Sequence, residues 1–116
     1  MTYVRHWRSI ASMIFIESPI FTRRLLSLLS DEEYTAFQSF LINNPESGKV
    51  IKGTGGLRKV RVSASGHGKR GGARVIYYHF VSTSQIALVF IYAKDEQADL
   101  TADQKKALKQ VIDTWR

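Results

Sequence analysis

Residues 85–92 constrain the fold more than any other segment, because every residue after Gln85 in this run is apolar or aromatic. A strand with one face in water alternates apolar and polar residues, whereas a continuously apolar strand is covered on both faces. We therefore predict that residues 85–92 form a central strand. Residues 73–81 are rich in Val, Ile, Tyr and Phe, which favours a neighbouring strand, and residues 82–84 form the turn between the two.

Two helices are predicted before these strands. Ser18-Pro19 is typical of a helix start, since Ser can accept a bond from a free backbone amide and Pro is tolerated at the first helical position. A helix over residues 19–29 follows. Ser30 has Glu33 three residues later, which is the pattern of a capping box and predicts a second helix over residues 31–43. Asn44-Pro45 ends it.

The remaining elements complete an α+β domain. Residues 57–62 follow the glycine-rich turn at 53–56 and are predicted to form a strand in which Lys59 and Arg61 share one face and Arg58 has the other. Residues 101–115 are predicted to form a last helix, and residues 13–16 an edge strand. The order β-α-α-β-β-β-α is interpreted as an antiparallel sheet with helices packed on one side. We expect a single domain over residues 13–116, preceded by an N-terminal extension over residues 1–12.

Positive charge is concentrated in one stretch of the chain. The net charge is +7, and residues 47–94 contain no Asp or Glu. Such an uncompensated stretch predicts a polyanionic partner such as nucleic acid. Its cations are Lys49, Lys52, Arg58, Lys59, Arg61, Lys69, Arg70, Arg74 and Lys94.

Several other classes of protein are disfavoured. The chain has no cysteine, so disulfides, thiol nucleophiles and Cys-based zinc sites are excluded, and a reducing, cytoplasmic location is expected. Three separated histidines show no metal-ligand spacing, and the glycine-rich segments lack a complete nucleotide-binding fingerprint, so we expect no metal and no cofactor. The apolar runs are shorter than the roughly 20 residues of a membrane helix, so no membrane association is expected.

The basic stretch supplies the residue types that chemistry on an RNA phosphate requires: cations, a proton acceptor and a surface that holds an unstacked base. His79 and at least one of Tyr77 and Tyr78 are interpreted as packing residues of the sheet. The acids Asp95, Glu96 and Asp99 are interpreted as structural, near the start of the last helix. The candidates for function are Lys59, Arg61, His67, Lys69, Arg70, Arg74, Tyr92 and Lys94.

Three runs carry a resemblance to a known family: 55–62 (GGLRKVRV), 68–78 (GKRGGARVIYY) and 91–96 (IYAKDE). In combination they resemble the RelE superfamily of bacterial toxins, closest to its HigB branch. The likeness extends over residues 13–115. It implies the toxin of a type II toxin–antitoxin system, a ribosome-dependent and metal-independent endoribonuclease (an mRNA interferase) that cuts messenger RNA in the decoding site and inhibits translation.

The resemblance also implies partners and residue roles. The partners would be the ribosome, its mRNA and a cognate antitoxin with a DNA-binding helix-turn-helix domain, the toxin–antitoxin complex binding operator DNA. Lys59 and Arg61 would transfer protons and bind phosphate, Arg74 would balance transition-state charge, Tyr92 would stack or orient, and Lys94 would add positive charge. The residues expected to hold RNA or the ribosome are Arg58, His67, Lys69 and Arg70.

Two departures and two alternatives stay open at this point. RelE has an Arg directly after the position of Lys94 and a Tyr at the start of the last helix, where this chain has Asp95 and Thr101. The same superfamily contains ParE-like inhibitors of DNA gyrase, and fold alone does not choose between them. A non-catalytic nucleic-acid-binding module is the third interpretation.

Overall fold

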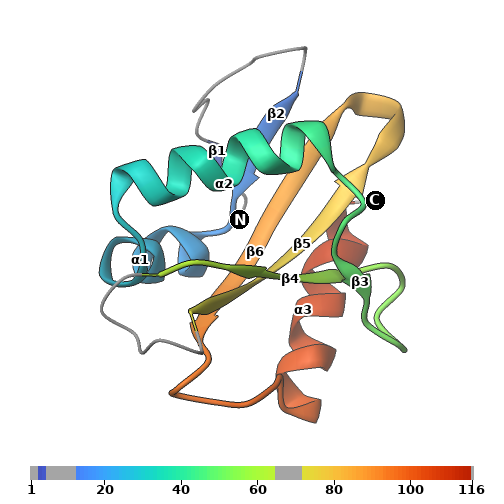
Figure 1. Ribbon diagram of the computed structural model, residues 1–116. Helices are drawn as coiled ribbons and strands as arrows, with labels where there is room; N and C mark the ends of the chain where they lie inside the picture. Colours follow the sequence, from blue (N-terminus) through green and yellow to red (C-terminus); the bar gives the residue numbers. More distant parts are fainter. Residues whose placement is uncertain (1–2, 5–12, 65–71, 116) are drawn as a thin grey trace.

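A computed structural model describes residues 3–4, 13–64 and 72–115 (Figure 1). The helices and strands form an α+β domain, as the sequence predicts. In chain order they are β1 (Tyr3–Val4), β2 (Ile14–Glu17), α1 (Pro19–Leu28), α2 (Asp31–Asn43), β3 (Lys49–Val50), β4 (Arg58–Val62), β5 (Ala73–Phe80), the short 3-10 turn Val81–Thr83, β6 (Gln85–Ala93) and α3 (Ala102–Trp115).

The sheet has the strand order β1-β2-β6-β5-β4-β3. Strand β6 lies between β2 and β5, and every residue in it after Gln85 is buried, which confirms the predicted central strand. The pairs β5–β6 and β4–β5 are antiparallel, as expected. The expected edge position of residues 13–16 was wrong. Strand β2 pairs in parallel with β6 on one side and antiparallel with β1 on the other.

Both predicted helix starts are confirmed. The Ser18 side chain accepts a hydrogen bond from the Phe21 amide at 3.1 Å, and Pro19 takes the first turn of α1. At the start of α2, the Ser30 hydroxyl accepts from the Glu33 amide at 3.1 Å while the Glu33 carboxylate accepts from the Ser30 amide at 2.9 Å. These bonds satisfy amides that a helix leaves without partners.

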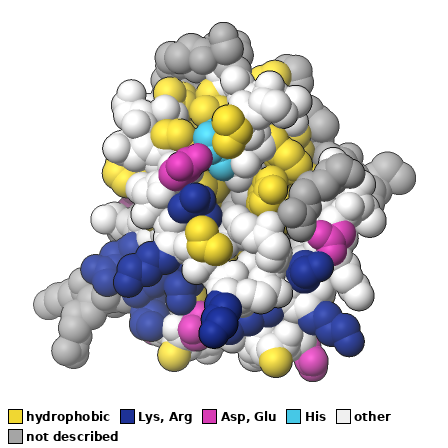
Figure 2. Space-filling view, turned by 90° about the vertical axis from the view of Figure 1, so that its right-hand side faces the viewer, with side chains coloured by type: hydrophobic (Ala, Val, Ile, Leu, Met, Phe, Trp, Pro, Cys, Tyr) yellow, Lys and Arg dark blue, Asp and Glu magenta, His cyan; other side chains and the backbone are white. Residues whose placement is uncertain are grey.

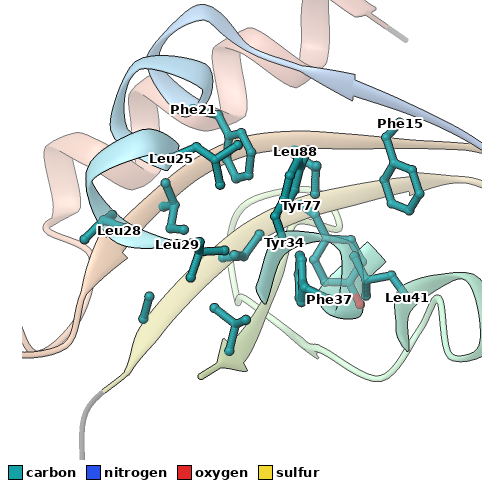
Figure 3. Packing of buried hydrophobic residues seen from close by; sticks show 14 of the residues in the cluster. Phe15, Phe21, Leu25, Leu28, Leu29, Tyr34, Phe37, Leu41, Tyr77 and Leu88 are labelled. Atoms are coloured by element: carbon teal, nitrogen blue, oxygen red, sulfur yellow. The ribbon is translucent and has the colours of Figure 1, made fainter. Parts of the chain in front are cut away.

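The two faces of the sheet carry separate apolar clusters. Alternate residues of β5 belong to different clusters, Val75 and Tyr77 to one and Ile76 and Tyr78 to the other. The first cluster contains the buried apolar residues of α1 and α2, as Figure 3 shows for Phe21, Leu25, Tyr34, Phe37 and Leu41. The second contains Leu108 and Ile112 of α3.

The helices therefore divide between the two faces. The expected one-sided packing describes α1 and α2, while α3 covers the opposite face (Figure 1). The physical reason lies in β6, whose two faces are both apolar and both need a cover. Among the described residues, no helix is long and apolar enough to cross a membrane.

Candidate nucleic-acid interface

Arg61, Arg74 and Tyr92 form one row across three neighbouring strands. Arg61 of β4 lies opposite Arg74 of β5, and Arg74 lies opposite Tyr92 of β6. The row is on the same face of the sheet as α3. Leu57 points to the same side as Arg61, and Ile76 to the same side as Arg74, and both belong to the apolar cluster that contains Leu108 and Ile112 of α3. The sheet thus joins three predicted functional residues that the chain separates by up to 31 positions (92 − 61).

A second cationic row lies beside the first. Lys49 of β3 is opposite Lys59 of β4, and Lys59 is opposite Ile76 of β5. Like charges directly opposite each other on a sheet repel and lower its stability. This sheet contains two such pairs, Lys49 with Lys59 and Arg61 with Arg74. An arrangement that costs stability without an anion present is suited to binding one.

Lys59 has an acidic neighbour in the loop before α3, Asp99, which the sequence places near the basic face and which we interpreted as structural. Its Nζ lies 3.0 Å from Asp99 Oδ1, and the two side chains are 30% and 57% exposed. The hydrogen bond from Lys59, together with one from the Leu100 amide, holds the pKa of the Asp99 carboxyl below its usual value. Asp99 therefore lies in the loop before α3 and also pairs with a cation of the basic face.

No local signal in the sequence could have found this contact, because Lys59 and Asp99 are 40 residues apart. By contrast, Glu96 is structural as interpreted: its carboxylate pairs with Arg24 and accepts from the Ala93 amide at 2.8 Å.

Tyr92 lies beneath this surface and not on it. Its side chain is fully buried, with its ring 6.0 Å from that of Phe90. Burial, with a smaller contribution from the charge of Asp99 and against the opposing charge of Arg74, raises the pKa of Tyr92 to about 12. Within the part of the chain that the structure describes, its hydroxyl has no hydrogen-bond partner. Stacking on a base would require residues around the ring to move, so an orienting role suits its position better.

Lys94 and Arg74 lie at the same end of the sheet. The Lys94 Nζ donates to the Ala98 carbonyl at 2.8 Å, and its amide donates to the Gly72 carbonyl at 3.0 Å. Arg74 is half-buried and one of its guanidinium nitrogens lies 3.3 Å from the Ala73 carbonyl. Figure 2 shows Lys and Arg side chains gathered on one part of the surface, with acidic side chains beside them.

Arg58 differs from the other predicted cations because it braces the chain. Its Nη1 donates to the carbonyls of Glu46 and Gly48 at 3.1 and 2.7 Å, which ties the segment after α2 to β4. The same segment is held by the Tyr77 hydroxyl, which donates to the Pro45 carbonyl at 2.9 Å. The expectation that Arg58 holds RNA therefore competes with a structural task, and Tyr77 is a packing residue as interpreted.

Three predicted contacts, His67, Lys69 and Arg70, lie outside the described residues. His79 is placed in the sheet, with Nδ1 3.6 Å from the Glu46 carboxylate, away from the two cationic rows. Among the described residues, no cluster of three His, Asp or Glu side chains is arranged to hold a metal ion.

The fold and this face together define a class: a small α+β domain that presents paired cations on the strands of its sheet. A protein-family model described as the RelE toxin of the RelE/RelB toxin–antitoxin system matches residues 30–116. The chain therefore belongs to the RelE toxin family. Membership of this family makes the protein the toxin of a toxin–antitoxin pair, and it implies a cognate antitoxin as partner.

Proposed function

We propose that the protein is a ribosome-dependent endoribonuclease of HigB type that cuts messenger RNA in the decoding site. The observation that carries the proposal is the pair of cationic rows on β3, β4 and β5, in a chain of the RelE toxin family. Cutting would occur in the cytoplasm, on translating ribosomes. The antitoxin, with a helix-turn-helix domain, would neutralise the toxin and bind operator DNA with it. Residues 13–116 would be the toxin domain.

The proposed reaction needs no metal ion. The 2′-oxygen of a nucleotide attacks the adjacent phosphorus, the bond from phosphorus to the 5′-oxygen breaks, and a 2′,3′-cyclic phosphate and a 5′-hydroxyl result. One group accepts the 2′-hydroxyl proton and another protonates the leaving oxygen. Lys59 and Arg61, neighbours on one face of β4, are the candidates for phosphate binding and proton transfer.

Charge builds up on the phosphate oxygens as the 2′-oxygen attacks, and fixed cations stabilise it. Arg74 suits this role because a guanidinium stays charged and can hold two phosphate oxygens at once. It lies directly opposite Arg61, so both can reach one phosphate from adjacent strands. Lys94 would add positive charge at the same end of the sheet, and Tyr92 would orient these groups from below.

The test is cleavage of a defined messenger RNA in a reconstituted translation reaction, with 5′ ends mapped by primer extension. Lys59→Ala, Arg61→Ala and Arg74→Ala should each reduce the cleavage rate by at least about 100-fold, the usual effect of removing one group that stabilises transition-state charge. Lys109→Ala is the matched control, because this cation lies on α3 and pairs with Asp113 there. Circular dichroism checks folding.

Undiminished cleavage in all three variants would contradict the proposal. Inhibition of gyrase in a supercoiling assay, without cleavage, would assign the toxin to the ParE-like class. Salt-sensitive RNA binding without cleavage in any reaction would identify a non-catalytic binding module.

A further inference from the structure

The loop between β6 and α3 delivers the Asp99 carboxylate to Lys59. It is held at several points: Glu96 pairs with Arg24, Gln97 Nε2 donates to the Asp99 carbonyl at 2.8 Å, and the same amide donates to Gln104 Oε1 at 2.8 Å. Gln104 in turn caps the start of α3 through Thr101. The position of Asp99 is thus built into the fold.

Asp99 occupies the place where a phosphate oxygen would bind Lys59. A carboxylate and a phosphodiester each carry one negative charge and accept hydrogen bonds from an ammonium group at about 2.7–2.9 Å. The observed distance between Lys59 Nζ and Asp99 Oδ1 is 3.0 Å. Since both side chains are partly exposed, an incoming phosphate can reach Lys59, but the positive charge that it meets there is already offset by Asp99.

Tyr92 offers a second partner for the same carboxylate. Its buried hydroxyl is a donor without an acceptor among the described residues, which is a costly state for a buried polar group. Tyr92 lies in the row of Arg61 and Arg74, which is next to Lys59 on β4. The charge of Asp99 is one of the causes that raise the pKa of the Tyr92 phenol. The Tyr92 hydroxyl is thus a candidate donor for a carboxylate released from Lys59.

We propose that Asp99 is a positioning residue. It holds Lys59 in place of an RNA phosphate in the free toxin, yields Lys59 to that phosphate, and then accepts a hydrogen bond from the Tyr92 hydroxyl. The inference rests on the proposed function for the identity of the anion, RNA. It adds a counter-ion that sets how tightly the cationic rows bind their substrate. Removing the carboxylate should strengthen binding by more than the same change in net charge does at a site away from the cationic rows.

The first test measures binding of a 2′-O-methyl oligoribonucleotide, which cannot be cut, by fluorescence anisotropy with the full chain and no ribosome. Asp99→Asn should bind about three- to fivefold more tightly, the scale of one partly exposed ion pair. Asp113→Asn is the matched control, since it makes the same change in net charge and breaks the exposed Lys109 pair on α3. Equal affinities for the two variants, or weaker binding by Asp99→Asn, would overturn the proposal.

The second test is a double-mutant cycle. Tyr92→Phe should weaken oligonucleotide binding about twofold when Asp99 is present and leave it unchanged in an Asp99→Ala background, because contacting residues are energetically coupled. Equal effects in both backgrounds would overturn the part assigned to Tyr92. Carbon-13 NMR of the Asp99 carboxyl adds a direct readout: its pKa should rise when the oligonucleotide binds, and an unchanged pKa would show that Lys59 is never released.

These outcomes separate the inference from the proposed function. If the wild-type toxin cuts no messenger RNA but Asp99→Asn binds the oligonucleotide more tightly, the nuclease proposal fails and the counter-ion stands. If the wild type cuts messenger RNA and Asp99→Asn binds no more tightly than Asp113→Asn, the counter-ion alone fails.

Discussion

Tyr92 illustrates how one buried residue links the stability of the protein to its site. The sequence placed it on the functional face, and its phase on β6 is right, since it lies opposite Arg74. A central strand covered on both faces implied that Tyr92 is buried, but which element covers it was not predictable, because that depends on how α3 and the preceding loop pack over the strand. The phenol therefore lies beneath the cations as a support.

The raised pKa of Tyr92 predicts a loss of stability in alkali. Because the folded-state pKa of about 12 lies above the ordinary value of 10.0, the unfolded chain releases the proton first as the pH rises. The free energy of unfolding does not depend on this proton below pH 10 and falls as the pH rises from 10 through about 12. Denaturant unfolding of wild type and Tyr92→Phe at a series of pH values measures it as the difference between the two. A difference that stays constant over this range would contradict the assignment.

Two glycines allow the cost of a left-handed backbone to be measured with and without a steric clash. Gly72 has φ +56°, and a Cβ there would lie 2.5 Å from the Val62 carbonyl oxygen; Gly53 has φ +79° with open space around it. Gly53→Ala should cost about 1 kcal/mol for the left-handed conformation alone. Gly72→Ala should cost at least about 1 kcal/mol more, since it also forces two strands apart. The free energies of unfolding of the two variants test this, and equal values would show that β4 relaxes freely.

At the scale of elements, Glu17 joins β2 to both helices that follow it. It is fully buried, and its two carboxylate oxygens accept hydrogen bonds from the Thr22 hydroxyl of α1 and the Tyr34 hydroxyl of α2, each at 2.6 Å. The helices themselves were predictable from Ser18-Pro19 and the capping box at Ser30, which are local signals. Their attachment through a buried acid was not, because it joins residues 17 positions apart.

Tyr34→Phe should therefore destabilise the protein by about 2 kcal/mol, as expected when a buried acceptor loses a hydrogen-bond donor. Tyr92→Phe provides a matched control at neutral pH, since it removes the same atom from a hydroxyl with no partner among the described residues. It should leave the free energy of unfolding unchanged or raise it. Chemical denaturation of both variants at pH 7 compares them, and a loss in Tyr92→Phe as large as in Tyr34→Phe would refute the difference.

At the scale of the whole molecule, the distribution of charge matters more than the total of +7. The sheet gathers Lys49, Lys59, Arg61 and Arg74 on neighbouring strands, while Lys109 is paired on α3. Cations that contact RNA phosphates release counterions when RNA binds, and affinity then falls with rising salt. Cations elsewhere contribute little to this dependence.

We accordingly expect Arg61→Met to lower the slope of log affinity against log salt by about one for oligonucleotide binding, with Lys109→Met leaving it unchanged. Anisotropy titrations at four or five salt concentrations measure both slopes. A common slope for the two variants would mean that net charge alone, and not the cationic rows, binds the RNA.

Periodicity and capping specified the elements from residues only a few positions apart. They were sufficient for the buried central strand, for both helix starts, and for placing Lys59 and Arg61 on one face of β4 with Arg58 on the other. The row from Arg61 through Arg74 to Tyr92, the contact of Asp99 with Lys59, the burial of Tyr92 and the position of α3 all depend on strand order and register. Those contacts join segments 13 to 40 residues apart, and chain closure over such distances leaves no trace in local sequence.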